Sequence, residues 1–148
     1  MKPEDPYDLN RFLSAQEGLY ERALAELKGG EKRTHWMWFI FPQIDGLGHS
    51  PTARHYAIKS MEEARQYLDH PVLGKRLVEC TEAVVALKGG SVSEIFGYPD
   101  DLKFKSSMTL FEKIAGSRSV FSSALDKYCR GERDAATLRL LEKLNFLK

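Results

Sequence analysis

The sequence lacks several features that mark large classes of proteins. It has only two cysteines, Cys80 and Cys129, which argues against a disulfide framework, and no Cys or His pattern is spaced for zinc. We therefore expect no structural metal, and we predict that both cysteines are buried free thiols in a reducing compartment. Lys and Arg number 22 and Asp and Glu 21, so the formal net charge is only +1. Nucleic-acid binding depends on many cations that face phosphates, and nucleic acid is therefore not an expected partner.

Long apolar runs and a secretion signal are also missing. No stretch approaches the ~20 apolar residues of a membrane span, and the polar segment 1–10, with its prolines, does not resemble a signal peptide. We therefore expect a cytoplasmic protein with no membrane partner. The G-x-S-x-G motif of serine hydrolases is absent as well, and no cofactor is predicted.

The sequence does have the composition and patterning of one helical domain. Its 148 residues, 43% hydrophobic and 29% charged, suffice for a single core. Glycines, prolines and N-cap residues divide the chain into segments whose apolar residues recur at three- and four-residue steps. We predict an all-α fold, a compact single domain over residues 1–148 built as a bundle of about six to eight helices, several of them short.

The helix boundaries follow from cap and breaker residues. A first helix, capped by Asp8, is predicted to run through residue 27, and a second over 34–41 ends at a proline. The remaining helices are expected from 51, over 60–69, from 71 to the Gly89-Gly90 pair, from about 100, over 119–129 and from 134 onward, with a turn near 93–96.

Bulky apolar and aromatic side chains are concentrated in residues 35–43, which begin with His35 and end with Gln43. Polar side chains held beside a rigid apolar wall are typical of ligand pockets. His35 is the candidate for a hydrogen bond or a proton, and Trp38 for a stacking face. Gln43 is predicted to contact a ligand amide or base edge. The alternative is that His35 and Gln43 serve only the ends of a helix.

A glycine-bearing loop over residues 46–50 leads directly into a predicted helix start. Free backbone N–H groups at such a position attract anions. Gly48 and Ser50 are predicted to bind phosphate through backbone and hydroxyl. Arg54 or Lys103 is predicted to neutralise its charge, and Tyr56 is a further candidate on the same short helix as Arg54. Taken alone, the loop is better explained as a turn and a helix cap, which need no ligand.

Further polar positions complete the predicted cleft. Lys103 and Ser107 lie one helical turn apart on one face of a later helix and are expected on the cleft wall. Gln16 flanks the apolar face of the first helix, as either a buried hydrogen-bond bridge or a pocket residue. Asp101 is the candidate catalytic carboxylate beside His35, with a role as a helix cap as the alternative.

Five segments carry a resemblance to a known family: DPYDLNRF at 5–12, AQ at 15–16, HWMWFIFPQ at 35–43, GLG at 46–48 and KSSMTLF at 105–111. They resemble a bacterial family of domains of unknown function whose members are often labelled calpastatin. The resemblance covers nearly the whole chain and implies an all-helical single domain with no established activity. Calpastatin-type inhibitors are disordered and built from repeats, whereas this chain is periodic and unrepeated, so we do not adopt that label.

A more distant similarity depends on the order of four elements: a glycine loop, a short helix with Ala53 and Tyr56, a Pro71-x-x-Gly74 turn and an Asp100-x-x-Lys103 helix. It is similar to N-glycosidases that act on ADP-ribose-like compounds or riboflavin precursors. The similarity implies an N-glycosidase-type hydrolase if the chain is an enzyme. Such cleavage needs a carboxylate near the anomeric carbon, and residues 46–56 lack the glutamate that this group places there.

Together these features favour a domain that binds a phosphorylated, nucleotide-like small molecule in a polar cleft, with hydrolysis of that molecule left open. The competing hypothesis is a non-enzymatic protein-interaction domain, in which Trp36, Phe39 and Phe41 are buried or contact a partner. The pattern predicts neither the substrate nor the oligomeric state.

Overall fold

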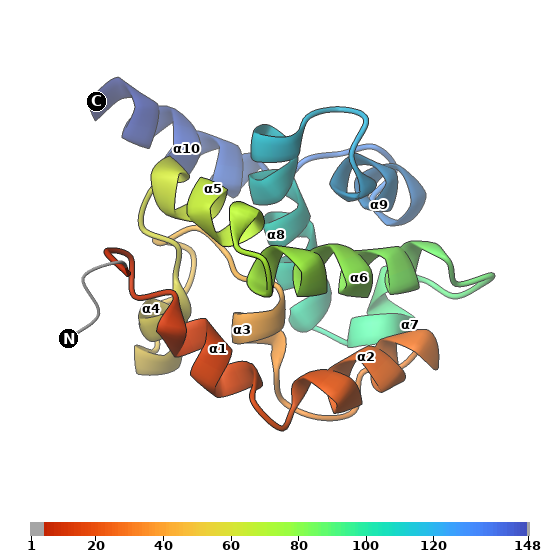
Figure 1. Ribbon diagram of the computed structural model, residues 1–148. Helices are drawn as coiled ribbons and strands as arrows, with labels where there is room; N and C mark the ends of the chain where they lie inside the picture. Colours follow the sequence, from red (N-terminus) through yellow and green to blue (C-terminus); the bar gives the residue numbers. More distant parts are fainter. Residues whose placement is uncertain (1–4, 148) are drawn as a thin grey trace.

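The computed structural model describes residues 5–147, and the side chains among them through residue 144. This part of the chain forms ten helices (Figure 1), none of which is long and apolar enough to cross a membrane. In chain order the helices are α1 (Asn10–Gln16), α2 (Tyr20–Lys28), α3 (Met37–Ile40), α4 (Pro51–Tyr56), α5 (Met61–Asp69), α6 (Leu73–Val85), α7 (Val92–Phe96), α8 (Asp100–Ala115), α9 (Val120–Tyr128) and α10 (Ala135–Leu147).

The predicted all-α class is confirmed, because the described residues contain no strand beyond an isolated parallel bridge between Ile44 and Ile58. The predicted number of about six to eight helices is wrong. The helix expected over 8–27 is interrupted at Gly18, whose φ of +75° takes the backbone out of the helical region. The turn expected near 93–96 is the helix α7, which a capping box between Ser91 and Glu94 stabilises.

Side-chain caps explain where several helices begin. The predicted caps that accept a hydrogen bond from a backbone N–H of the first turn are Ser50, Ser60, Ser119 and Asp134. At α1 the predicted cap is wrong. The Asp5 carboxylate, not that of Asp8, accepts from the N–H groups of Leu9 and Asn10, at 2.7 and 3.0 Å.

The helix predicted over 34–41 is reduced to α3 because the residues before it bind Glu26 of α2. The Glu26 carboxylate accepts hydrogen bonds from the backbone of Arg33 and Thr34, from the Thr34 hydroxyl and from the indole of Trp36, at 2.8 to 3.1 Å. Burial opposes ionisation of this carboxyl, but these donors outweigh burial and lower the pKa of Glu26 to about 2. Because the Glu26 side chain already accepts from the backbone N–H groups of this segment, the segment does not form a helical turn.

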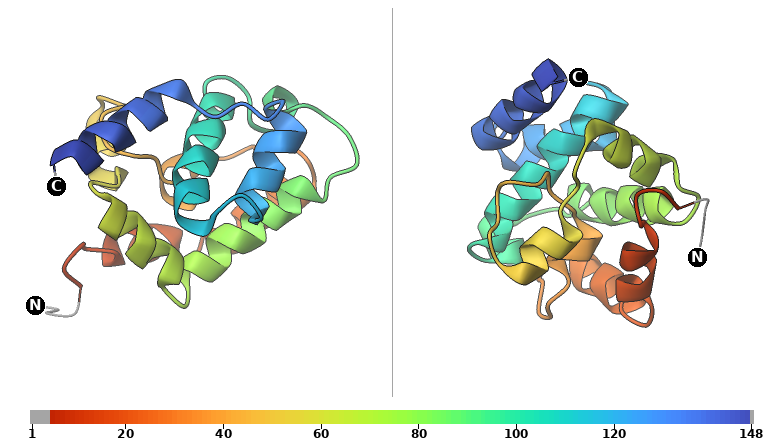
Figure 2. Two further views of the ribbon diagram at one scale, coloured as in Figure 1. Left: turned by 90° about the horizontal axis from the view of Figure 1, so that it is seen from above. Right: turned by 90° about the vertical axis from the view of Figure 1, so that its left-hand side faces the viewer.

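The helix α8 forms the centre of the core. Its residues 106–111 are all buried, and α8 packs against α5, α7, α9 and α10 (Figure 2). The hydroxyls of Ser106 and Thr109 donate to the carbonyls one turn earlier, at 3.1 and 2.8 Å. The hydroxyls of these short side chains thus find hydrogen-bond partners on their own helix, and the small side chains leave room for neighbouring helices. The helix α6 crosses in front of α8 in Figure 1 and contacts α2, α5 and α9.

A buried ion pair joins α1 to α5. The Arg11 guanidinium lies 2.5 Å from the Glu63 carboxylate, and the two side chains are 9% and 2% exposed. Arg11 also donates to the carbonyls of His55 and Ala57 at 2.8 and 3.0 Å, which fixes the end of α4. The other oxygen of Glu63 accepts from the backbone N–H of Lys59. Both charged groups are thus fully partnered, as burial requires.

Candidate functional site

A cavity of about 420 Å³ lies between α3, the α3–α4 connection, the first turns of α8 and the start of α10. This volume is in the range of small-molecule sites, about 300–1,000 Å³. We term it the Trp38 cavity. Lining residues that the sequence analysis selected are Trp38, Gln43, Gly48, Ser50 and Lys103.

Close packing holds the connection that forms one wall of the cavity. The backbone bridge between Ile44 and Ile58 ties its beginning to the segment after α4. A Cβ atom on Gly48 would lie 2.6 Å from the Cβ of Ala53, so only glycine allows this approach to α4. The Ser50 hydroxyl then caps α4 by accepting from the N–H of Ala53 at 3.1 Å. The wall is therefore set by backbone contacts rather than by flexible side chains.

Polar groups on this wall have no partners inside the described chain. The indole N–H of Trp38 and the carboxamide of Gln43 make no hydrogen bond there, and both side chains are half-buried. The backbone N–H groups of residues 47–49 likewise donate to no described group. Fully buried polar atoms are nearly always paired in native proteins. These groups remain accessible and are free to bind water or a ligand.

The cavity has a cation held over an aromatic ring. The Lys103 ammonium lies 4.5 Å from the centre of the Trp38 ring and 3.2 Å from the carboxylate of Asp100. The other oxygen of Asp100 lies 2.9 Å from the ammonium of Lys32, whose side chain is only 7% exposed. Two lysines thus share one carboxylate, which leaves this corner of the cavity with an excess of one positive charge.

Three predicted ligand-binding residues, on α1 and α4, do not line the cavity. Tyr56 lines a smaller hollow of about 10 Å³ that shares Trp38 and Gln43 with the cavity, and this is room for about one water molecule. Arg54 is exposed on α4 and is not a lining residue. Gln16 is only 1% exposed and lies in the core.

Gln16 is a buried hydrogen-bond bridge, the alternative that the sequence left open. Its amide nitrogen donates to the carbonyl of Phe39 at 2.7 Å and to the hydroxyl of Tyr67 at 3.3 Å. Its oxygen accepts from Arg76 at 3.1 Å. These contacts connect α1, α3, α5 and α6, and they leave the Gln16 amide no capacity directed at a ligand.

The other predicted residues also fall away from the cavity. Ser107 is fully buried on α8, and its hydroxyl oxygen has no hydrogen-bond partner among the residues described. His35 is exposed before α3 and is not a lining residue. The Asp101 carboxylate accepts from the Ser93 hydroxyl at 2.8 Å and from the following backbone N–H at 2.9 Å, as a helix-start residue does. The candidate catalytic pair is therefore not assembled at this cavity.

Sequence reasoning missed several lining residues, among them His49, Leu102, Ser106 and Asp134. Leu102 and Ser106 lie beside Lys103 on one face of α8, and that spacing could have indicated them. Asp134 comes from a distant part of the chain, and its carboxylate caps α10 by accepting from the N–H of Thr137 at 3.0 Å. Nothing local in the sequence distinguishes it from an ordinary cap.

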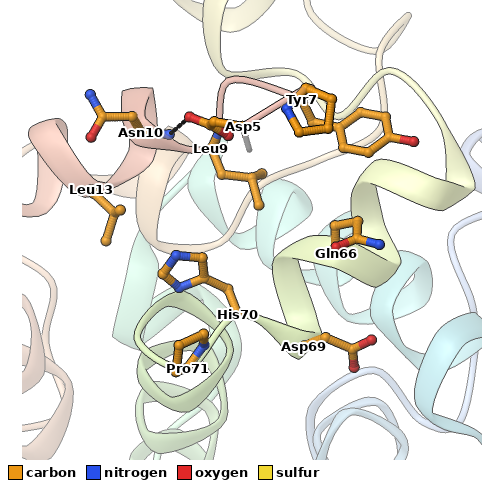
Figure 3. Close-up of a pocket in the computed structure, with 10 residues that line it drawn as sticks. Asp5, Tyr7, Leu9, Asn10, Leu13, Gln66, Asp69, His70 and Pro71 are labelled. Carbon is orange, nitrogen blue, oxygen red and sulfur yellow. Dashed lines mark hydrogen bonds between the residues drawn. The ribbon is translucent and has the colours of Figure 1, made fainter. Parts of the chain in front are cut away.

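A second cavity, of about 540 Å³, lies between the segment before α1, α1 itself and the end of α5 (Figure 3). Asp5 serves the N-terminus of α1, and His70 accepts through Nδ1 from the N–H groups of Val72 and Leu73 at 3.1 and 3.2 Å. A third cavity, of about 640 Å³, lies between α6 and α9. Neither contains a cation held over an aromatic ring, which distinguishes the Trp38 cavity.

Both cysteines are free and buried, as predicted. Burial raises the pKa of Cys80 to about 12 and also raises that of Cys129, so both thiols stay protonated at neutral pH. Protonated, enclosed thiols are poor nucleophiles and poor metal ligands. Across residues 5–147, no group of three His, Cys, Asp or Glu side chains could hold a metal ion.

Comparison with known proteins gives a family and a close structural relative. A model of the family described as "Protein of unknown function (DUF1810)" matches residues 6–141, which include every residue that lines the Trp38 cavity. The crystal structure of the conserved hypothetical protein Rv1873 from Mycobacterium tuberculosis is similar, with 51% sequence identity and a TM-score of 0.90. The similarity covers 93% of this chain and 99% of that chain. No curated protein matches.

Proposed function

This chain belongs to the DUF1810 family, and we propose that its Trp38 cavity binds a small phosphorylated, nucleotide-like molecule. One observation carries the proposal: the unpartnered Trp38 indole N–H and Gln43 carboxamide lie in the same cavity as the Lys103 ammonium. Polar groups that a fold leaves unpaired at a concave surface are available to a ligand. An aromatic ring, an amide and a cation together match a ligand with a planar part and an anionic part.

The planar part of the ligand is assigned to Trp38 and Gln43. An indole ring provides a flat stacking surface of low conformational entropy. A carboxamide offers donors and an acceptor side by side, and this arrangement pairs with the edge of a nucleobase. The backbone bridge at Ile44 and the hydrogen bond from the Ile58 N–H to the Gln43 carbonyl fix the backbone that carries this amide before a ligand arrives.

The anionic part is assigned to Lys103, Ser50 and the N–H groups of residues 47–49. The oxygen of the Ser50 hydroxyl already caps α4, so its hydrogen is free to donate to a phosphate oxygen. Charge-assisted hydrogen bonds from an ammonium to a phosphate are stronger than neutral ones. Lys103 supplies one positive charge to the lining, and the Asp134 carboxylate of the same lining supplies one negative charge, so a ligand with a single phosphate group suits the cavity better than one with several.

Binding, rather than hydrolysis, is the activity proposed. N-glycosidic cleavage needs a carboxylate at the anomeric carbon. The lining carboxylate is Asp134, and its Oδ2 atom accepts from both the backbone and the hydroxyl of Thr137. Asp101 and His35 do not line the cavity. No carboxylate free of a structural role therefore faces the proposed ligand.

The competing interaction-domain hypothesis has less support. It allowed Trp36, Phe39 and Phe41 either to be buried or to contact a partner, and these side chains are 1%, 8% and 0% exposed. They belong to the hydrophobic core. Aromatic residues that are already buried cannot provide a docking surface without unfolding part of the domain.

The proposal is tested by calorimetric titration with adenosine 5′-monophosphate, ribose 5-phosphate and inorganic phosphate. We expect the nucleotide to bind most tightly, because it alone engages both Trp38 and the phosphate-binding groups. Replacing Gln43 by Ala removes the amide contact and should weaken nucleotide binding about tenfold.

Lys103→Ala tests the contribution of the ammonium. Its matched control is Lys113→Ala, which removes an exposed lysine from the other end of α8. It has the same change in net charge as Lys103→Ala and should leave nucleotide binding unaltered. Equal weakening in both lysine variants would indicate a general effect of charge. Absence of nucleotide binding by the unaltered protein would refute the proposed function.

A further inference from the structure

Lys103 lies over one face of the Trp38 ring, and both residues line the same cavity. Its ammonium lies 4.5 Å from the centre of the Trp38 ring, within the range of a favourable cation–π contact. A planar group stacks on an indole at a van der Waals separation of about 3.5–4 Å. The ammonium and a ligand ring therefore cannot share this face. Stacking here requires Lys103 to move first.

The surroundings of Lys103 make such a movement possible. Its side chain is 23% exposed, and its second partner is the Asp100 carboxylate at 3.2 Å. Removing one member of an enclosed ion pair normally leaves the other charge uncompensated. Here Lys32 stays 2.9 Å from the other oxygen of Asp100 and is itself almost completely buried. Asp100 therefore keeps a cation when Lys103 leaves.

We propose that Lys103 is a specificity gate, which makes the Trp38 cavity select phosphorylated ligands over their unphosphorylated counterparts. This inference rests on the proposed function of the cavity. A phosphate attracts the ammonium, replaces its contacts with Asp100 and Trp38, and uncovers the indole for stacking. A neutral nucleoside has to displace the same ammonium without offering it a new partner. Asp100 and Lys32 act as positioning residues that hold the gate closed in the free protein.

The test compares adenosine with adenosine 5′-monophosphate in the unaltered protein and in Lys103→Ala. The substitution uncovers Trp38 and removes the cation, so we expect adenosine to bind at least about threefold more tightly. The monophosphate should bind at least about tenfold more weakly. The preference for the phosphorylated ligand should thus collapse. Lys113→Ala, on the same helix, should retain it.

A second variant keeps the lysine and tests the gate independently. Asp100→Asn removes one of the two contacts that hold Lys103 over Trp38, so adenosine, which has to displace the ammonium without offering it a partner, should bind about threefold more tightly. Circular dichroism and thermal unfolding check that each variant is folded. If Lys103→Ala does not fold, the result for Asp100→Asn decides whether Lys103 acts as a gate.

The outcomes separate the two proposals. If the unaltered protein binds the monophosphate but Lys103→Ala weakens both ligands alike, or leaves adenosine binding unchanged, the gate is refuted and the proposed function stands. Adenosine binding that is unchanged or weaker in Asp100→Asn also refutes the gate. If the unaltered protein binds neither ligand, the proposed function and the gate fail together.

Discussion

Two glutamines that look alike in the sequence have opposite environments in the molecule. Gln16 is 1% exposed, and its amide is hydrogen-bonded to Phe39, Tyr67 and Arg76. Gln43 is half-buried beside a cavity, and its amide has no partner within the described chain. The first amide connects helices, whereas the second remains available. A polar side chain near an apolar wall indicates a binding site only when the fold does not already use it.

The two tryptophans repeat this contrast. Trp36 is 1% exposed and donates its indole N–H to Glu26 at 2.9 Å. Trp38, two residues later, lines the cavity, and its indole N–H has no partner among the residues described. The comparison therefore separates an internally bonded region, which should determine stability, from the Trp38 cavity, which should determine binding.

The largest expected effect is on stability, at the buried ion pair. Replacing Glu63 by Ala leaves the Arg11 guanidinium without its carboxylate and should cost about 3–5 kcal/mol of unfolding free energy. The measurement is urea denaturation followed by circular dichroism. Glu62→Ala, beside it on α5, removes a half-exposed carboxylate that lies 3.0 Å from Arg65, and should cost less than about 1 kcal/mol. Similar losses in both variants would contradict this account of the pair.

The next effect compares the two glutamines directly. Gln16→Ala removes hydrogen bonds to Phe39, Tyr67 and Arg76 on three other elements, two of them buried, so we expect a loss of about 2–3 kcal/mol. Gln43→Ala removes an amide without internal partners and should change stability by no more than about 0.5 kcal/mol. Denaturation measures both losses, and the nucleotide titration should give the reverse order of effects. If Gln43→Ala were the more destabilising variant, the claim that Gln16 rather than Gln43 stabilises the fold would be wrong.

The stability of the protein should depend on pH through Glu26, the carboxylate that accepts from the Trp36 indole. The pKa of Glu26 is lowered to about 2, below its ordinary value of 4.5, so the ionised form stabilises the folded state. This contribution is complete above the ordinary pKa and is lost as the pH falls toward 2. Solvent screening at this partly exposed carboxylate limits it to about 1–2 kcal/mol. Denaturation at pH 6 and pH 3 should show a smaller difference in Glu26→Gln than in the unaltered protein.

The smallest effect on stability is expected at Ser50, which belongs to both regions. Ser50→Asp keeps an oxygen that caps α4, so the free energy of unfolding should change by less than about 0.5 kcal/mol. The new carboxylate faces the proposed phosphate, however, and should abolish nucleotide binding by like-charge repulsion. Ser50→Asn provides the neutral cap for comparison. Unchanged nucleotide affinity in Ser50→Asp would place the phosphate elsewhere.

Local signals in the sequence predict much of the fold but not its polar contacts. Caps such as Ser50 and Ser119 act within one helical turn, and the helices that they begin are confirmed. The break at Gly18 falls in continuous apolar periodicity, which predicted a single helix there. The roles of Gln16 and Gln43 could not be separated, because the partners of Gln16 come from 51 and 60 residues away. Neighbouring residues carry no information about such contacts.

The candidate site was predictable where one segment carries several of its residues. The run at 35–43 and the glycine loop supply Trp38, Gln43, Gly48 and Ser50, which line the same cavity. His35 belongs to the same run, yet the loop held by Glu26 leaves it exposed away from the lining residues. Asp134 enters from the start of α10, which packs on α8 and brings a distant cap into the wall.

The most direct test of the account observes these side chains individually during titration. In the 1H–15N spectrum, adenosine 5′-monophosphate should shift the indole signal of Trp38 and the carboxamide signals of Gln43. The corresponding signals of Trp36 and Gln16 should stay in place, because those groups are already bonded within the fold. Saturating nucleotide that moves neither Trp38 nor Gln43, or that moves Trp36 and Gln16 equally, would contradict the claim that the unpartnered groups form the binding site.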